Sequence, residues 1–145
     1  MSGQDDRAVT GESSADLRRL GLETMFSVVS SAPPPDGIDL RDGALGEDLV
    51  EIGLVSVWAG LWAREGLGRR ERSLVTLGVL IALGAEEEFA SHVLIAQRNG
   101  LTDSEIAEVV YHASGYAGFP RAMAARKAAR KALGVPEQHD AKEGR

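Results

Sequence analysis

A carboxylate and an imidazole, Glu88 and His92, stand four residues apart in this sequence. On a helix, this spacing brings both side chains onto one face within contact distance. The carboxylate can then fix the tautomer of the ring and raise its pKa, which makes the pair a candidate general acid and base. An ordinary ion pair on a helix surface is the alternative interpretation. Because the chain has three histidines and no cysteine, few other groups can move protons, and thiol chemistry is excluded.

Arginine and tryptophan side chains supply two further candidate sets. The run Arg69-Arg70-Glu71-Arg72 begins an expected helix, where the helix dipole disfavours cations. A bound anion would explain these arginines, since arginine binds carboxylates through two hydrogen bonds; a solvated helix start is the alternative. Trp58 and Trp62 share a helix face, which indicates core or a subunit interface, or else a flat wall for an unsaturated ring.

A second ladder of polar residues, Glu108, His112 and Tyr116, repeats every four residues on an otherwise apolar stretch. It predicts an exposed face, a pocket wall or a polar seam between subunits. Glu88, His92 and His112 together could supply three metal ligands. We expect no metal site, because such spacing is common by chance and no thiolate is available.

Bulk composition limits the class of protein. The 145 residues suit one domain with a hydrophobic core; we place it at residues 16–136, between a disordered arm at 1–15 and a polar tail at 137–145. The formal net charge of −6 argues against a nucleic-acid partner. No apolar run approaches the ~20 residues of a membrane-spanning helix, and the acidic N-terminus does not resemble a signal peptide. We therefore expect a cytoplasmic protein that binds no membrane.

Apolar residues recur with helical periodicity along most of the chain, which predicts an all-α fold of about six helices. Pro33-Pro34-Pro35 ends the first helix, and Asn99-Gly100 supplies a left-handed stop after the fourth. Thr102 and Glu105 form a capping box at the start of the fifth, which we expect Gly115, Gly118 and Pro120 to interrupt. The expected helices cover residues 16–29, 45–62, 69–83, 86–98, 103–113 and 121–133.

Several short blocks share their order and spacing with one known family. The blocks are Trp62-Ala63-Arg64-Glu65-Gly66-Leu67, Arg72-Ser73-Leu74-Val75-Thr76-Leu77, Glu88-Phe89-Ala90-Ser91-His92, Asn99-Gly100-Leu101-Thr102, Glu105-Ile106, Glu108-Val109-Val110 and Tyr116-Ala117-Gly118-Phe119-Pro120. Together they resemble the carboxymuconolactone decarboxylase family over somewhat more than half of the chain.

The resemblance implies an orthogonal helical bundle like that of alkylhydroperoxidase D, assembled into homotrimers or homohexamers with pockets near the subunit contacts. The redox branch of this superfamily works through a CxxC motif and a nearby histidine, and a chain without cysteine cannot perform that chemistry. The decarboxylase branch implies a lyase without a cofactor. Its small-molecule substrate is an unsaturated lactone that carries a carboxylate and is produced during the breakdown of aromatic compounds.

Four residues fall on positions that match the family: Glu88, His92, Arg72 and Tyr116. The resemblance implies that His92, oriented by Glu88, donates a proton. It also implies that Arg72 binds the carboxylate or the lactone oxygen of the substrate. The remaining expected substrate contacts are Trp58, Trp62, Tyr116 and His112, the last as a reserve acid or base.

One segment departs from the family pattern. The decarboxylases carry a polar stretch with His and Asp before the tryptophan that matches Trp62, whereas this chain has Ser56-Val57-Trp58-Ala59-Gly60-Leu61. We therefore expect a more apolar pocket that accepts a larger ring. The departure leaves two alternatives open. One is isomerisation, cyclisation or lactone processing by the same fold, and the other is a non-catalytic oligomer that binds a small molecule.

Overall fold

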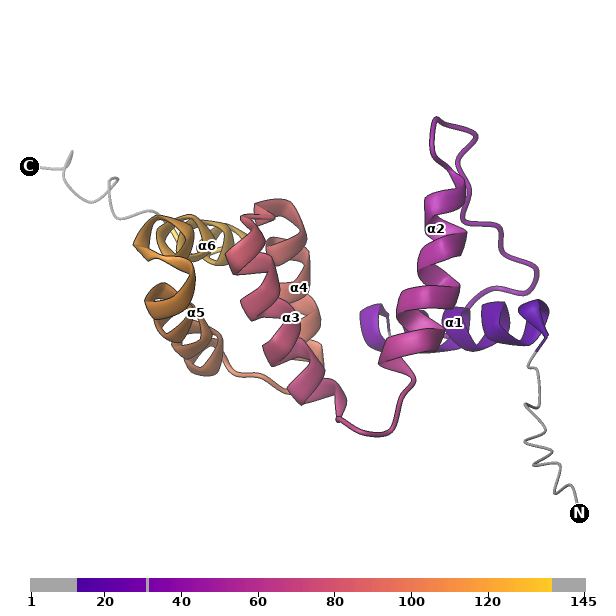
Figure 1. The fold of residues 1–145 in the computed structure, drawn as a ribbon, viewed down its shortest axis with the longest axis horizontal. Helices are drawn as coiled ribbons and strands as arrows, with labels where there is room; N and C mark the ends of the chain where they lie inside the picture. The colour runs from indigo at the N-terminus through magenta and orange to yellow at the C-terminus, as the bar shows by residue number, and fades with distance from the viewer. Residues whose placement is uncertain (1–12, 31, 137–145) are drawn as a thin grey trace, which may run out of the picture. The chain divides into compact units, whose positions relative to one another are not determined.

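A computed structural model describes residues 13–30 and 32–136, and every regular element within them is a helix (Figure 1). The predicted all-α class is confirmed. The elements are α1 (Ser14–Val29), α2 (Asp48–Gly53), the π-helix η1 (Leu54–Trp62), α3 (Arg69–Leu83), α4 (Glu86–Arg98), α5 (Asp103–Ala117) and α6 (Phe119–Ala132). Most of the arm expected at 1–15, and all of the tail expected at 137–145, lie outside the described residues.

The chain divides into two compact units, Met1–Arg64 and Glu65–Arg145. The domain expected at 16–136 therefore spans parts of both units. Helices α1, α2 and η1 belong to the first unit, and α3 to α6 belong to the second. No helix in the described part of the chain is long and apolar enough to cross a bilayer.

In the first unit, α1 packs closely against η1. Gly21 permits this approach, because a Cβ atom at that position would lie 2.2 Å from the carbonyl oxygen of Leu54. The guanidinium of Arg18 donates to both carboxylate oxygens of Glu51, at 2.6 and 2.8 Å, and to the carbonyl oxygen of Ile38 at 2.8 Å. One arginine of α1 thus ties together α2 and the loop that precedes it.

The helix expected at 45–62 differs from a single regular helix in two ways. It begins at Asp48, and it passes into π-helical geometry at Leu54. The buried residues of η1 are Leu54, Ala59 and Trp62, so the buried face advances first by five residues and then by three. A π-helix has wider turns than an α-helix and is rare, and a search for a period of 3.6 residues does not detect it.

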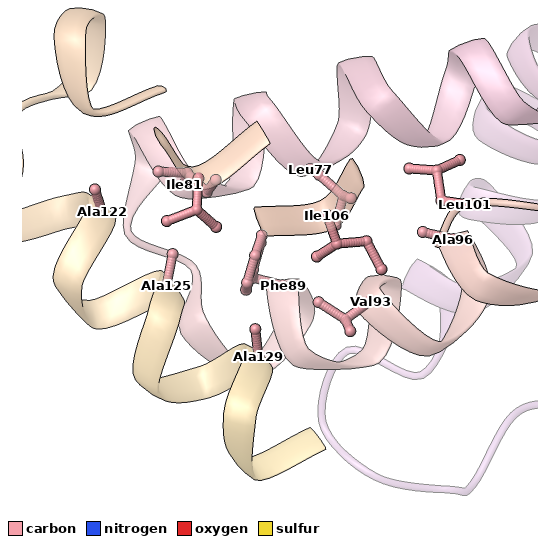
Figure 2. Packing of buried hydrophobic residues seen from close by; sticks show 11 residues of the cluster. Leu77, Ile81, Phe89, Val93, Ala96, Leu101, Ile106, Ala122, Ala125 and Ala129 are labelled. Carbon is pink, nitrogen blue, oxygen red and sulfur yellow. The ribbon is translucent and has the colours of Figure 1, made fainter. Parts of the chain in front are cut away.

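Helices α3 to α6 enclose the larger core, shown in Figure 2. Helix α4 packs on α3 and α6, and α5 packs on the same two helices. Three alanines of α6 at helical spacing line this core, so the backbone of α6 can approach its neighbours closely. The buried members are Leu77, Ile81, Phe89, Val93, Ala96, Leu101, Ile106, Val110, Ala122, Ala125 and Ala129.

Glycine stops α3 and α4 where the sequence predicts. Gly84, with φ of 69°, ends α3, and a Cβ atom there would also collide with the guanidinium of Arg121. After α4, the amide of Leu101 donates to the carbonyl oxygen of Ala96 at 2.9 Å, and the side chain of Leu101 is buried. The predicted left-handed stop at Gly100, with φ of 95°, is confirmed.

Helix α5 begins with the predicted capping box of Thr102 and Glu105. The expected interruption at Gly115 is wrong, because α5 continues through this exposed glycine to Ala117. A glycine inside a helix costs only about 1 kcal/mol relative to alanine, which tertiary packing can offset. The interruption expected at Gly118 is confirmed, because α5 ends there with φ of 94°. Helix α6 then begins at Phe119, two residues earlier than expected.

Candidate active site

His92 lies in the middle of α4 and is half-buried, whereas Glu88, one turn earlier, is exposed. Burial lowers the pKa of His92 below its ordinary value of 6.5, and the negative charge of Glu88 opposes this shift only in part. The imidazole is therefore neutral near pH 7. The sequence predicts the direction of the effect of Glu88 correctly, but burial outweighs it.

The side of α4 that carries His92 faces α3. Glu88, His92 and Asn99 follow one another at spacings of four and seven residues, which places them on one stripe of the helix. The side-chain amide of Asn99 donates a hydrogen bond of 2.9 Å to the hydroxyl of Ser73 on α3, and Ser73 is buried. This bond joins α3 to the C-terminal end of α4, on the stripe that also carries His92.

Arg72 lies at the edge of the same contact between α3 and α4. It immediately precedes Ser73, it is half-buried, and its Nε atom is buried. Because α3 and α4 are antiparallel neighbours, Arg72 lies near the Asn99 end of the stripe. His92 is seven residues from Asn99, roughly 10 Å along the helix axis. A substrate that contacts both Arg72 and His92 therefore has to span this distance.

Arg70 has an anionic partner within the chain itself. Its guanidinium donates to both carboxylate oxygens of Glu105, one bond being 3.0 Å, and to the carbonyl oxygen of Gly100 at 2.7 Å. The hydrogen bonds from Arg70, followed by that from the amide of Thr102, lower the pKa of Glu105 to about 2. Part of the arginine run is thus explained by a structural ion pair between α3 and the start of α5.

A groove of about 700 Å³ runs between α3 and α5. The polar ladder Glu108, His112 and Tyr116 lines one wall, with the rings of the last two 5.2 Å apart between centroids. All three side chains are also exposed, so the ladder is an exposed face that lines a pocket, which combines two of the three possibilities that the sequence leaves open. His92 and Arg72 are not among the lining residues.

The structure thus separates two groups of residues that the sequence analysis combines. Arg70 lines the groove, and Arg72 follows it by two residues, which places Arg72 about 200° further around α3. Arg72 lies at the Asn99 end of the contact between α3 and α4, and His92 lies further along α4. His112 and Tyr116 line the groove between α3 and α5.

The two tryptophans belong to the other compact unit. Their rings lie 5.6 Å apart between centroids with an interplanar angle of 33°, so Trp58 and Trp62 share a face as expected. Trp62 is buried and Trp58 is half-buried. Within this unit, the pair contributes to the packing of η1, and its role in substrate binding stays a prediction.

The α3 wall of the groove is the feature that sequence reasoning missed. It consists of residues four apart, Arg70, Leu74, Gly78 and Ala82. The polar ladder on α5 has the same spacing of four residues. Two neighbouring helices that each carry such a stripe could have indicated a groove from the sequence alone. Among residues 13–30 and 32–136, no three His, Asp or Glu side chains gather in a way that could hold a metal ion.

Comparison with known proteins agrees with the resemblance. Residues 43–131 match the carboxymuconolactone decarboxylase family. The chain is 37% identical to 4-carboxymuconolactone decarboxylase of Acinetobacter baylyi over 121 residues, which cover 70% of this chain and 90% of that protein. It is 34% identical to nitrosuccinic acid decarboxylase npaB of Metarhizium robertsii over 113 residues, covering 68% and 79%. The chain therefore belongs to the carboxymuconolactone decarboxylase family and is a decarboxylase-like enzyme.

Proposed function

We propose that this protein is a cofactor-independent lyase that removes CO2 from a cyclic, unsaturated carboxylate or lactone. The similarity to two decarboxylases carries this proposal. The names of both relatives denote acids that also contain an electron-withdrawing group, a lactone in one and a nitro group in the other. Such a group stabilises the carbanion that forms when CO2 leaves, and we expect it in the substrate of this protein.

Decarboxylation breaks the bond between carbon and the carboxylate and leaves the electron pair on the substrate. The pair moves into the conjugated carbonyl group, so the site needs a cation at that oxygen and an acid that protonates carbon. We assign the acid to His92 and the oxygen contact to Arg72. A contact that strengthens as negative charge develops on the oxygen would raise the rate, whereas a grip on the ground-state carboxylate alone would only aid binding.

His92 must gain a proton before it can donate one, because its lowered pKa keeps it neutral near pH 7. The carboxylate of an incoming substrate adds a negative charge to that of Glu88, and a nearby anion favours the imidazolium form. Substrate binding therefore raises the pKa of His92 and favours the protonated acid. After CO2 leaves, the imidazolium gives this proton to carbon and returns to its neutral form, so each turnover consumes one proton from solvent.

Measurement of CO2 release tests this function, with 4-carboxymuconolactone and nitrosuccinate as the first substrates. The His92→Ala substitution should lower kcat at least ~100-fold, the usual contribution of one acid–base group. Ser91→Ala is the matched control, since Ser91 is an exposed neighbour on α4 whose hydroxyl bonds only a backbone carbonyl among the bonds described.

Three results would contradict the proposal in different ways. A near-normal rate in the His92→Ala variant refutes the assignment of the acid. Turnover of these compounds without CO2 release indicates isomerisation, cyclisation or lactone processing. Binding without turnover indicates a non-catalytic oligomer.

A further inference from the structure

The groove between α3 and α5 has two unlike walls. On α3 the wall is small and smooth, because a Cβ atom at Gly78 would meet nothing within 4 Å and Ala82 adds only a methyl group. On α5 the rings of His112 and Tyr116 form the opposite wall. Leu74, which packs on the core beneath, supplies an apolar base. A smooth wall that faces two aromatic rings suits a flat ring system.

The dimensions suit a molecule larger than a single ring. The lining residues run from Arg70 to Ala82 on α3 and from Glu105 to Ala117 on α5. Each span of twelve residues corresponds to roughly 18 Å of helix. The volume of about 700 Å³ lies within the range of small-molecule sites. Two or three fused rings fit such a groove.

The charges of the groove disfavour an anion. The positive charge of Arg70 is engaged by Glu105 at one end, and Glu108 lies outside that ion pair on the α5 wall. A carboxylate in the wall repels anions and accepts hydrogen bonds from hydroxyl groups. The phenol of Tyr116 and the imidazole of His112 add further donors and acceptors.

We propose that this groove is a second ligand site, separate from the Glu88–His92 pair, for a flat, uncharged molecule of two or more fused rings that carries hydroxyl groups. The decarboxylation site must attract a carboxylate, whereas the groove repels one, so the two sites take different ligands. The polar ladder along the α5 wall also argues against an apolar helix as the occupant of the groove. Such a helix would bury the charge of Glu108 away from water, which is costly.

Titration with 2,6-dihydroxynaphthalene, followed by its fluorescence, tests the site on the full-length protein. The matched anionic probe is 6-hydroxynaphthalene-2-carboxylate, in which one hydroxyl is replaced by a carboxylate. We expect saturable binding of the diol, at least ~10-fold tighter than that of the carboxylate, about 1.4 kcal/mol. Glu108→Gln should bring the two probes within ~3-fold of each other, as the loss of one charge contact predicts. Glu87→Gln, at an exposed position on α4, is the control and should leave the preference unchanged.

A second pair of variants locates the probe. Gly78→Leu fills open space in the groove and should weaken diol binding at least ~10-fold. Gly115→Leu is its control, because Gly115 is also a helical glycine with nothing within 4 Å of a Cβ atom, on α5 but outside the lining. Tyr116→Ala should likewise weaken binding by ~10-fold through the lost ring contact, and its exposed side chain can be removed without disturbing the core. His92→Ala should bind the diol like the unaltered protein.

The proposal is overturned if the unaltered protein shows no saturable binding of the diol, or if both leucine variants lose it equally. A diol that does not bind, combined with a changed assembly mass in the Gly78→Leu variant, identifies a second copy of the chain as the occupant. Loss of diol binding in the His92→Ala variant would show that the two sites are one.

Discussion

The imidazole of His92 is subject to two opposing influences, burial against α3 and the charge of Glu88 one turn away. The spacing of four residues predicts that Glu88 lies close enough to act, and it does. The sequence does not predict that burial is the larger influence, because burial depends on the packing of α4 on α3. The bond between Asn99 and Ser73, which lie 26 residues apart, is one contact of that packing.

The lowered pKa of His92 predicts that acid destabilises the protein. Since the pKa in the folded state lies below 6.5, the unfolded chain binds more protons as the pH falls through that value. The free energy of unfolding should therefore decrease below about pH 6.5, and His92→Gln should remove this part of the decrease. Urea denaturation of both proteins at about pH 7.5 and about pH 5.5 measures the difference.

The ion-paired carboxylate of Glu105 acts in a lower pH window, so it does not obscure this result. The pKa of Glu105 is held at about 2, below its ordinary value of 4.5, and its contribution to stability is lost as the pH falls from 4.5 towards 2. An equal loss of stability between neutral pH and pH 5.5 in both proteins would contradict the role of His92.

At the scale of elements, a helix can be predicted well where particular residues mark its beginning and its end. The observed bounds of α3 and α4 agree with the prediction, since Gly84 and Gly100 stop them and three glutamates open α4. The π-helical geometry of η1 could not be predicted, because a π-helix is rare and no single residue type in Leu54–Trp62 marks it. Helix α5 continues past Gly115 and ends at Gly118, the second of the three expected interruptions, because a single glycine disfavours a helix only weakly.

Gly21 predicts a measurable cost for one added methyl group. Gly21→Ala would place a Cβ atom against the backbone of Leu54, which cannot move as a side chain can. We expect the free energy of unfolding to decrease by about 1–3 kcal/mol, the usual cost of overpacking. Gly53→Ala is the control, since nothing lies within 4 Å of a Cβ atom there. It should leave stability unchanged or raise it by up to about 1 kcal/mol. If thermal or chemical unfolding shows the same change in the free energy of unfolding for both variants, α1 and η1 can move apart to accommodate the added methyl group.

The bond between Asn99 and Ser73 predicts a positional effect on catalysis. Asn99→Ala should decrease the free energy of unfolding by about 1–3 kcal/mol, because it leaves the buried hydroxyl of Ser73 without this bond. Adding Ser73→Ala should restore part of that loss, and a double-mutant cycle measures the coupling. If α4 positions His92 through this bond, kcat should fall in both Asn99 variants, even where stability recovers. If the effects of Asn99→Ala and Ser73→Ala on the free energy of unfolding are additive, the two side chains do not interact and the hydrogen bond is contradicted.

At the scale of the whole molecule, apolar side chains remain exposed along one stripe of α3. Val75, Val79 and Leu83 follow at intervals of four residues and are 58%, 50% and 67% exposed. Soluble proteins rarely leave such a continuous apolar stripe in water. It supports our proposal that the protein forms a homo-oligomer, a trimer or hexamer, in which this stripe is a subunit contact.

Val79→Lys should weaken that assembly, because a lysine in the contact would have to be desolvated. The mass of the protein in solution, measured by light scattering after size exclusion, should fall towards that of one chain. Gln97→Lys makes the same change of charge at an exposed position of α4 and should leave the mass unchanged. A protein that is monomeric without any substitution would refute the oligomer.

Both compact units are continuous in sequence, the first ending at Arg64 and the second starting at Glu65. No helix of the first unit has to wait for a helix of the second in order to pack within its own unit. During synthesis on the ribosome, α1, α2 and η1 can therefore fold while α3 to α6 are still being translated, since chains commonly fold unit by unit from the N-terminus. The boundary at Arg64 thus also divides folding during synthesis into two successive events.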